Sequence, residues 1–209
     1  MDRTVVIGGG GHAKVLISLL KKSGHQIAGY TSLRDAGSIL DVPHIGDDSV
    51  LSELLRTSGR CQAVVGLGKV DTSPRRVQLA AELESLGFIL PVIVSPHAVV
   101  NEGVAMGSGT VVFDGAVINS GTKMGSLCIA NTNCTIEHDC RLGDNVHVAP
   151  GATLSGGVTV GDNSMIGAGS TVVQDASICA DCLVGAGSTV IADIAAPGTY
   201  AGNPVKRIR

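Results

Sequence analysis

Hydrophobic positions in the second half of the chain recur at every sixth residue, from Val94 to Val190, without a change of frame. Four positions after each of them, up to the last, stands Ala, Val, Ser, Thr or Cys. A period of six fits neither an α-helix nor a single strand, and it is typical of a parallel β-helix in which three hexads make one coil. The pattern predicts a β-helix whose interior is filled by the apolar residue and whose corners are made by Gly, Asn or Asp.

The first ninety residues follow another pattern, in which short β-branched stretches alternate with amphipathic ones. Strands are expected at 4–7, 26–30 and 61–67, and helices at 12–22, 48–56 and 74–86, with Asp47 or Asp48 capping the second helix. This alternation predicts a small parallel α/β sheet. Two prolines, Pro91 and Pro96, mark the boundary, so the expected domains are a Rossmann-like domain at 1–90 and a β-helix with a C-terminal tail at 91–209.

Composition narrows the classes of function. A net charge of −3 and 2% aromatic residues argue against nucleic-acid binding. No apolar stretch approaches the ~20 residues that span a membrane. Six cysteines and a Met-Asp start without a signal peptide indicate reduced thiols in the cytoplasm. Cys128, Cys134, Cys140 and Cys182 fall on the small positions and are expected to fill the core, while the lone CxxC formed by Cys179 and Cys182 is weak evidence for zinc.

A glycine-rich segment, GGGGHA, lies between the first expected strand and helix and matches G-x-G-x-x-A at Gly8, Gly10 and Ala13. Glycines let the backbone approach a phosphate, and the helix N-terminus favours negative charge. The second strand ends in Thr and Ser rather than in an acid that would hold a ribose, which argues against NAD. A nucleotide diphosphate or a turn without ligand remain as alternatives. The end of the third strand, at the same sheet edge, carries Gly66, Gly68 and Lys69.

One segment of the hexads carries candidate chemistry: NTNCTIEHDC, residues 131–140. His138 stands two residues after the inward Ile136, at a corner, between Glu137 and Asp139. An imidazole beside carboxylates is a candidate general base. A second histidine, His147, follows nine residues later, which is half a coil, so the two could serve one site only between subunits. The alternative for each is a surface histidine without a role.

These motifs carry a resemblance to a known family. Residues 94–209 resemble the left-handed β-helix (hexapeptide-repeat) acyltransferases, and PGTYAGNPVK at the end of the chain resembles their C-terminal signature. With GGGGHAK, NTNCTIEHD and VHVAPGA, nearly the whole chain resembles the bacterial nucleotide-sugar and sialic-acid acetyltransferases. The resemblance implies a left-handed parallel β-helix after the α/β domain, a homotrimer with acetyl-CoA between neighbouring prisms, and no metal.

The match of motifs also implies residue roles. His138 would be the general base, Asp139 would orient it, and Gly156 would offer a backbone N–H to the oxyanion. The acetyl-CoA site would contain His147, Gly202 and Lys206, and the nucleotide-sugar site Gly8, Gly10, Gly11, His12, Gly68, Lys69 and Asn131. Thr31 and Ser32 stand where relatives that use UDP-sugars often carry two acids, so GDP or another nucleotide stays open.

The expected function is therefore acetyl-CoA-dependent N-acetylation of the amine of a nucleotide-linked amino sugar, by direct transfer. Alternatives are O-acetylation of a sialic-acid-type sugar, a γ-type carbonic anhydrase with His97, His138 and His147 as zinc ligands, and a non-catalytic scaffold. A homotrimer would pack through flat, uncharged outer rows of the prism. Examples of residues expected to be exposed there are Val111, Val117, Ile129 and Val173.

Overall fold

The computed structural model describes residues 3–35 and 37–209. The chain divides into two compact units, one of Met1–Gly68 with Arg75–Pro91, the other of Lys69–Pro74 with Val92–Arg209. Residues 69–74, a loop of the first half of the sequence, thus belong with the second unit. Within residues 3–35 and 37–209, no helix has the length and apolarity that crossing a membrane requires.

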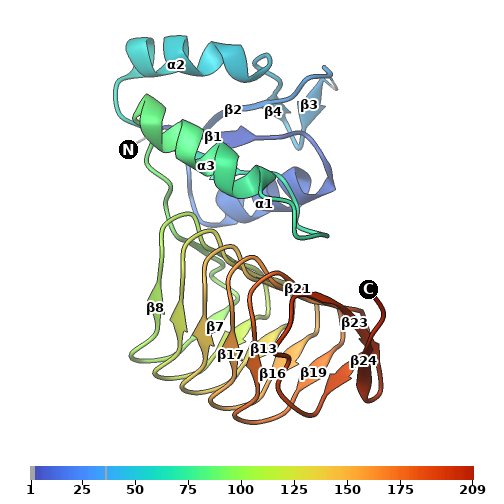
Figure 1. The fold of residues 1–209 in the computed structure, drawn as a ribbon. Coiled ribbons are helices and arrows are strands. Elements are labelled where there is room, and N and C mark those ends of the chain that lie inside the picture. Colours follow the sequence, from blue (N-terminus) through green and yellow to red (C-terminus); the bar gives the residue numbers. More distant parts are fainter. Residues whose placement is uncertain (1–2, 36) are drawn as a thin grey trace. The chain divides into compact units, whose positions relative to one another are not determined.

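The first unit is a three-stranded parallel sheet in the order β2-β1-β5 with helices between the strands (Figure 1). The strands are β1 (Arg3–Ile7), β2 (Ile27–Thr31) and β5 (Cys61–Val65). The helices are α1 (Gly11–Lys22), the short 3-10 helix η1 (Asp48–Val50) with α2 (Leu51–Ser58), and α3 (Arg75–Leu86). The parallel α/β sheet expected from the alternating pattern is confirmed. Asp47 rather than Asp48 is the N-cap of η1, because its side chain accepts from the Ser49 N–H at 3.0 Å, while Val50 stands at the N-cap of α2 without a side-chain bond.

A small antiparallel hairpin, β3 (Ser38–Ile39) with β4 (Val42–Pro43), was not expected from the sequence. Its turn places Leu40 and Asp41 at positive φ, 50° and 64°. Such turns normally signal themselves by Asn-Gly or Asp-Gly. Leu-Asp lacks that signal, and strands of two residues show no periodicity.

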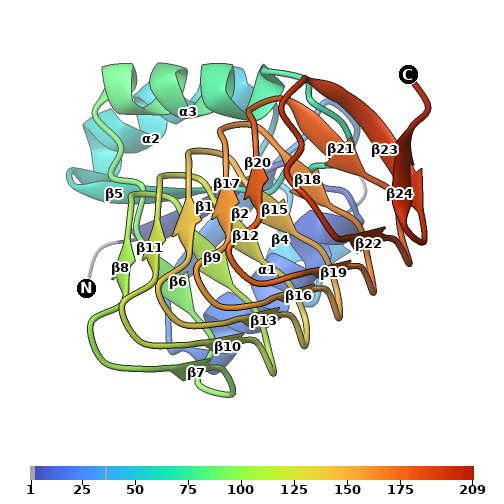
Figure 2. The ribbon, with the colours of Figure 1, turned by 60° about the horizontal axis from the view of Figure 1, so that its bottom comes forward.

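The second unit is the parallel β-helix that the hexad frame predicts, with the left hand that the resemblance implies (Figures 1 and 2). Each strand pairs with the strand eighteen residues later, as Val117 does with Thr135, so three hexads make one coil. We name each face by one strand. The β15 face contains β6 (Ile93–Val94), β9 (Val111–Val112), β12 (Ile129–Ala130), β15 (His147–Val148), β18 (Met165–Ile166) and β21 (Cys182–Val184), followed by β23 (Gly198–Gly202) and β24 (Val205–Arg207).

The two other faces consist of hexad strands alone. The β13 face consists of β7 (Val99–Val100), β10 (Val117–Ile118), β13 (Thr135–Ile136), β16 (Thr153–Leu154), β19 (Thr171–Val172) and β22 (Thr189–Val190). The β14 face consists of β8 (Ala105–Met106), β11 (Lys123–Met124), β14 (Arg141–Leu142), β17 (Thr159–Val160) and β20 (Ser177–Ile178).

Small residues in the hexads do more than fit a narrow space. All four cysteines expected in the core are fully buried. Cys128 Sγ donates to the Gly143 carbonyl at 3.1 Å, and Thr122 Oγ1 donates to the Glu137 carbonyl at 2.7 Å. The hydroxyl of Thr122 also accepts from the N–H of Cys140, eighteen residues on. Because corners interrupt the strand ladder, these side chains satisfy backbone groups that would otherwise be buried without a partner.

The corners share one backbone conformation. From residue 103 to residue 187, every sixth residue has positive φ, which is the left-handed region. Glycine, Asn or Asp occupies each of these positions except Leu127, as the tolerance of short polar residues for this region requires. Other corner glycines have ordinary φ and are needed for space. A methyl group at Gly143 would stand 2.0 Å from Asp162 Oδ1 and 2.8 Å from the Asp162 backbone nitrogen in the next coil.

The outer apolar residues of the prism are less exposed than expected. Val111 and Ile129, expected to be exposed, are 2% and 1% exposed on the β15 face, and Val117 and Val173 are half-buried. The expectation of a free apolar surface is therefore wrong for the β15 face. The sequence treats all three faces alike, because the hexad frame says nothing about which face other segments cover.

Two glycines should respond differently to the same substitutions. Gly151 has φ +67° and open space around it, so Gly151→Asn should be nearly neutral, and Gly151→Ala should cost about 1 kcal/mol of unfolding free energy. Gly143 lacks room, so both Gly143→Ala and Gly143→Asn should cost about 1–3 kcal/mol. Urea unfolding of the four variants measures this. Equal tolerance of Asn at both positions would contradict the distinction.

Candidate active site

The glycine-rich loop joins β1 to α1 at the carboxyl edge of the sheet. Gly8 has φ +118°, and a methyl group on it would stand 3.2 Å from the Gly66 carbonyl carbon. A methyl group on Gly9 would stand 2.9 Å from the Tyr30 ring. Gly10 is the N-cap of α1, so the first N–H groups of the helix, including those of Gly11 and His12, lie beside the loop. The loop thus has the backbone form that approaches a phosphate.

A cleft of about 800 Å³ opens beside this loop. It is lined by Gly8, Gly9, Thr31, Ser32, Asp48 and Arg75, among others. Thr31 Oγ1 donates to Asp48 Oδ1 at 2.5 Å. A carboxylate therefore stands at the end of β2 after all, but it comes from η1. Sequence reasoning missed Asp48 because it treated this aspartate as a helix cap, and it missed Arg75 because nothing local marks a residue at the start of a helix as part of a cleft.

The end of β5 leads into two predicted site residues with different surroundings. Gly68 belongs to the first unit, where a methyl group on it would stand 3.5 Å from His12 Cβ. Lys69 belongs to the second unit and is only 3% exposed. Its ammonium donates to the Asp71 carbonyl at 2.7 Å and to Asn163 Oδ1 at 2.8 Å. Protein acceptors thus engage the lysine that was expected to meet the substrate.

His147 lies on β15 and is 7% exposed. Its Nδ1 lies 2.7 Å from the Lys69 carbonyl oxygen, and its Nε2 lies 3.0 Å from Asn131 Nδ2. A carbonyl only accepts, so Nδ1 carries the proton and Nε2 accepts from the Asn131 amide. Asn131 Oδ1 in turn accepts from the Thr132 N–H at 2.8 Å. The imidazole is therefore held as one neutral tautomer, and it fixes the orientation of Asn131.

Asn163 is the second residue that holds the 69–74 loop. Its amide nitrogen donates to the Thr72 carbonyl at 2.7 Å and to Asp181 Oδ1 at 2.6 Å. Asn145, one coil earlier, donates to Asn163 Oδ1 at 2.9 Å. Asn145, Asn163 and Asp181 are eighteen residues apart and form one row of corners. We call this row the Asn163 row.

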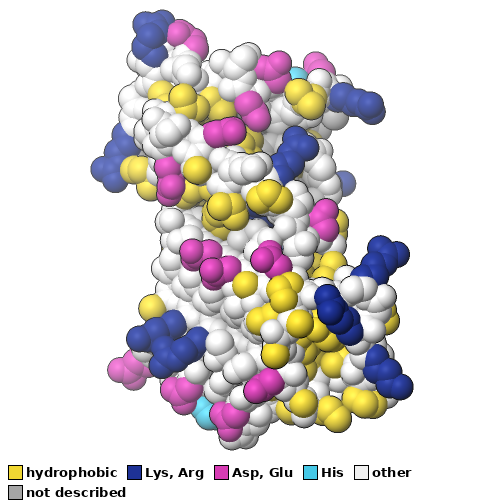
Figure 3. Space-filling view, viewed as in Figure 1, with side chains coloured by type: hydrophobic (Ala, Val, Ile, Leu, Met, Phe, Trp, Pro, Cys, Tyr) yellow, Lys and Arg dark blue, Asp and Glu magenta, His cyan; other side chains and the backbone are white. Residues whose placement is uncertain are grey.

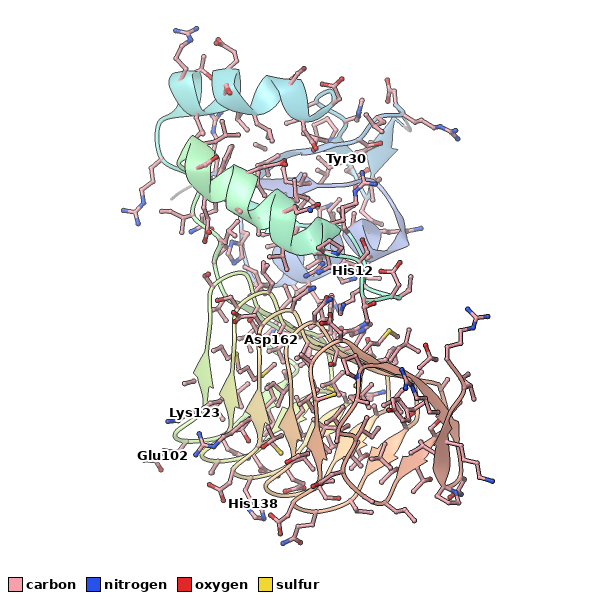
Figure 4. The ribbon with its side chains drawn as sticks, viewed as in Figure 1. His12, Tyr30, Glu102, Lys123, His138 and Asp162 are labelled. Carbon is pink, nitrogen blue, oxygen red and sulfur yellow. The ribbon has the colours of Figure 1, made fainter. Side chains whose placement is uncertain are left out.

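His138 occupies another corner of the prism, away from the corner of Asp162 (Figure 4). Its side chain is 59% exposed, and its Nδ1 lies 2.9 Å from Asp139 Oδ2. Figure 3 shows acidic side chains at the surface of the second unit. The hydrogen bond to Asp139 is the largest cause that raises the pKa of His138 above its ordinary 6.5. Desolvation opposes it, and the charges of Asp139, Glu137 and Asp175 raise the pKa further.

The imidazole of His138 lies directly over Gly156 of the next coil. A methyl group at Gly156 would stand 2.6 Å from His138 Nε2. The Gly157 N–H donates to the His138 carbonyl at 2.9 Å. Since Asp139 engages Nδ1, the free lone pair is that of Nε2. The structure thus brings together three predicted residues, His138, Asp139 and Gly156, in a geometry suited to proton transfer beside a backbone N–H.

The C-terminal signature forms the antiparallel hairpin β23–β24, which continues the β15 face. Gly202 has φ +110°, and its N–H donates to Ser188 Oγ at 3.2 Å. Lys206 pairs with Ala201 and is exposed. Two of the three residues expected at acetyl-CoA, Gly202 and Lys206, therefore belong to one hairpin, and the Lys206 ammonium is open to solvent.

The sequence also raises two other kinds of chemistry, a thiol nucleophile and a bound metal. Burial raises the pKa of Cys134 to about 12, so this thiol does not ionise near neutral pH. Within residues 3–35 and 37–209, no three or more His, Cys, Asp or Glu side chains of the chain gather to hold a metal ion.

Comparison with known proteins places the chain in a family. Residues 3–80 match the PglD N-terminal domain, and residues 121–156 and 157–192 match the bacterial transferase hexapeptide (six repeats). No curated protein matches the sequence.

Solved structures give close matches over the full length. The acetyltransferase domain of PglB from Neisseria gonorrhoeae is 34% identical, with 100% of both chains covered and a TM-score of 0.92; the same domain in complex with acetyl coenzyme A is 33% identical, with 100% of both chains covered and a TM-score of 0.90. A variant of perosamine N-acetyltransferase from Caulobacter crescentus, in complex with CoA and GDP-perosamine, is 37% identical, with 99% and 97% covered and a TM-score of 0.93. The chain belongs to the nucleotide-sugar acetyltransferase branch of the left-handed β-helix acyltransferases.

The carboxylate next to His138 should govern the pH dependence of acetyl transfer. A raised pKa keeps His138 protonated to a higher pH, so the acidic limb of kcat/KM should lie above pH 6.5. Asp139→Asn replaces the charged acceptor of the His138 hydrogen bond by a neutral one, which weakens the largest cause of the shift and removes the charge of Asp139. The acidic limb should therefore move to lower pH, while the plateau of kcat/KM falls. Asp175→Asn, which acts only through its charge, should move the limb much less. A limb that stays in place in Asp139→Asn would contradict the role of this pair.

Space at Gly156 should matter for activity more than for stability. Gly156→Ala pushes against the free end of the His138 side chain, which can swing away at little cost to the fold. If His138 acts as the base, displacement of its imidazole should lower kcat about 10²-fold. The control is Gly151→Ala, where a strained φ lowers stability but no catalytic group is near. Full activity in a Gly156→Ala variant would show that the position of the imidazole over Gly156 is irrelevant.

Proposed function

We propose that the protein transfers the acetyl group of acetyl-CoA directly to the amine of a nucleotide-linked amino sugar. The observation that carries the proposal is the arrangement at the His138 corner, where an exposed imidazole is bonded to Asp139 at 2.9 Å and rests on Gly156. Family membership supports it, because the PglB domain is bound to acetyl coenzyme A and perosamine N-acetyltransferase to CoA and GDP-perosamine.

The chemistry follows from the properties of the two reactants. A sugar amine is largely protonated near neutral pH, and its nitrogen attacks a thioester carbonyl only with a free lone pair. Neutral His138 takes a proton from the amine through Nε2 as the tetrahedral intermediate forms, while Asp139 holds the ring and stabilises its charged form. The Gly156 N–H donates to the oxyanion. Collapse of the intermediate expels CoA as the thiol, which takes up the proton, and no acyl-enzyme is formed.

The nucleotide occupies the cleft beside the glycine loop in this proposal. Its diphosphate lies at Gly8, Gly10 and Gly11, against the N-terminus of α1. Asp48 favours guanine over uracil, because guanine presents two adjacent donors, N1–H and N2–H₂, to a carboxylate and uracil presents one. The relative with GDP-perosamine bound agrees with this preference.

The acetyl-CoA site is assigned to the C-terminal hairpin, with Lys206 as a cation for the phosphates and Gly202 at the turn. We propose a homotrimer in which the His138 corner of one prism meets the hairpin of its neighbour. His147, expected at the thioester, instead has both ring nitrogens engaged and little exposed surface. We therefore assign to it the orientation of Asn131, and to Asn131 the contact with the sugar. All six cysteines are thiols in the structure, which suits a reducing cytoplasm.

Substitution of the proposed base tests the function. His138→Ala should keep the fold, because an exposed corner side chain supports no core. It should lower kcat by about 10²–10⁴-fold, with a smaller loss at high pH, where more amine is free. A thermal-shift panel of GDP-, UDP-, dTDP- and CMP-sugars should give the same pattern for variant and wild type, with the largest shift for the GDP-sugar.

Two control variants distinguish the loss of a general base from a general loss of activity or stability. His97→Ala removes an exposed prism histidine without an assigned role and should be fully active. Cys134→Ala should stay active with a stability loss on the order of 1 kcal/mol. Loss of turnover in folded Cys134→Ala would point to a covalent mechanism, and a His138→Ala variant with near wild-type kcat would end the proposal. Absence of CoA release with any amino-sugar nucleotide would do the same.

A further inference from the structure

Two cysteines of the prism lie in contact and have no part in the proposed reaction. Cys179 follows β20, Cys182 begins β21, and their Sγ atoms are 3.4 Å apart. Cys128, Cys134 and Cys140 instead each fill a separate interior position of successive hexads. The CxxC motif, which the sequence offers as a weak zinc signal, is thus a pair of neighbouring free thiols.

The backbone between the two residues suits a disulfide. Ala180 and Asp181 form a turn, with Asp181 at φ 57°. The end residues of a β-turn have Cα atoms less than about 7 Å apart, and a disulfide needs roughly 4.4–6.8 Å. A sulfur–sulfur bond is about 2.05 Å long. Closing the present gap therefore requires a small adjustment of the side chains within one corner.

The two thiols differ in access and acidity. Cys179 is half-buried and reaches solvent, whereas Cys182 is fully buried. Burial raises the pKa of Cys182 to about 12, and the hydrogen bond with Cys179 contributes in the same direction. An external reagent therefore meets Cys179 first, and Cys182 is placed to attack only what has formed on Cys179.

We propose that Cys179 and Cys182 are a redox modification site, which a low-molecular-weight disulfide such as oxidised glutathione converts to an intramolecular disulfide. The Cys179 thiolate attacks one sulfur of the reagent, breaks its S–S bond and expels one glutathione thiolate. The Cys182 sulfur attacks Cys179 Sγ and expels the second glutathione, which leaves as the thiol because it takes up the proton that Cys182 gives up in the same step. The protein dithiol is oxidised by two electrons, and the reagent is reduced to two thiols.

The corner that carries the two cysteines is bonded to two other parts of the second unit. Asp181, between the two cysteines, belongs to the Asn163 row and accepts from Asn163 at 2.6 Å. Its carbonyl accepts from the Gly198 N–H at 3.3 Å, and Cys182 pairs with Gly198 at the start of the C-terminal hairpin. The disulfide thus forms in a corner bonded both to the residue that holds the 69–74 loop and to the hairpin.

Mass spectrometry of the full-length protein treated with oxidised glutathione tests the proposal. Wild type should lose two hydrogen atoms, and a peptide map should locate the bond between Cys179 and Cys182. Cys182→Ser should stop at one glutathione on Cys179. Cys179→Ser should remain unmodified at this corner, because the buried Cys182 is out of reach. Cys134→Ala, which leaves the pair intact, should behave as wild type.

A second measurement uses the wild-type protein alone and so does not depend on the folding of a variant. Phenylarsine oxide, which bridges two adjacent thiols, should add one arsenical to the native protein and block the reaction with glutathione disulfide. Wild type that keeps both thiols in excess oxidised glutathione would overturn the proposal. So would a wild-type adduct on Cys179 that never resolves, or a disulfide to another cysteine. Neither readout depends on acetyl transfer, so failure here leaves the proposed function untouched.

Discussion

The structure depends on one constraint: a chain that turns at every sixth residue must stack each coil on the one eighteen residues later. The turn requires a left-handed residue in every hexad from 103 to 187, without a gap. Stacking then brings corners so close that Gly143 has no room for a methyl group under the next coil. Two demands, on φ and on space, therefore decide where Gly, Asn and Asp stand, and a missed turn in any hexad would shift every later strand out of register.

The same constraint explains where chemistry can reside in the prism. Interior positions are taken by aliphatic residues, and small positions are taken by side chains that satisfy corner carbonyls, as Thr122 does for Glu137. Only corners and outer rows are free to vary. Asp139 serves as a left-handed corner residue at φ 58° and as the partner of His138 at the same time. The catalytic proposal thus rests on a residue type that the fold already favours at that position.

Side chains in a corner row form hydrogen bonds from one coil to the next. Asn145, Asn163 and Asp181 form a ladder of side chains across successive coils, and Asn163 reaches the 69–74 loop through Thr72 and Lys69. His147 holds the same loop through the Lys69 carbonyl and orients Asn131. A buried lysine is tolerated here because its ammonium has close acceptors. A loop that follows the end of β5 and two prism residues are therefore parts of one polar network.

The sequence by itself determined the hexad frame, the three hexads per coil, the core cysteines and the α/β order of the first unit, because these follow from periodicity and from residue types that corners and strands require. It also singled out His138 with Asp139, which are neighbours in the chain. Tertiary structure alone decided that Gly156 lies beneath His138, that His147 meets Lys69, that Asp48 of η1 brings a carboxylate to the cleft, and that Cys179 touches Cys182. Those contacts join residues from different coils or elements, or depend on side-chain rotamers set by packing, and no local pattern records them.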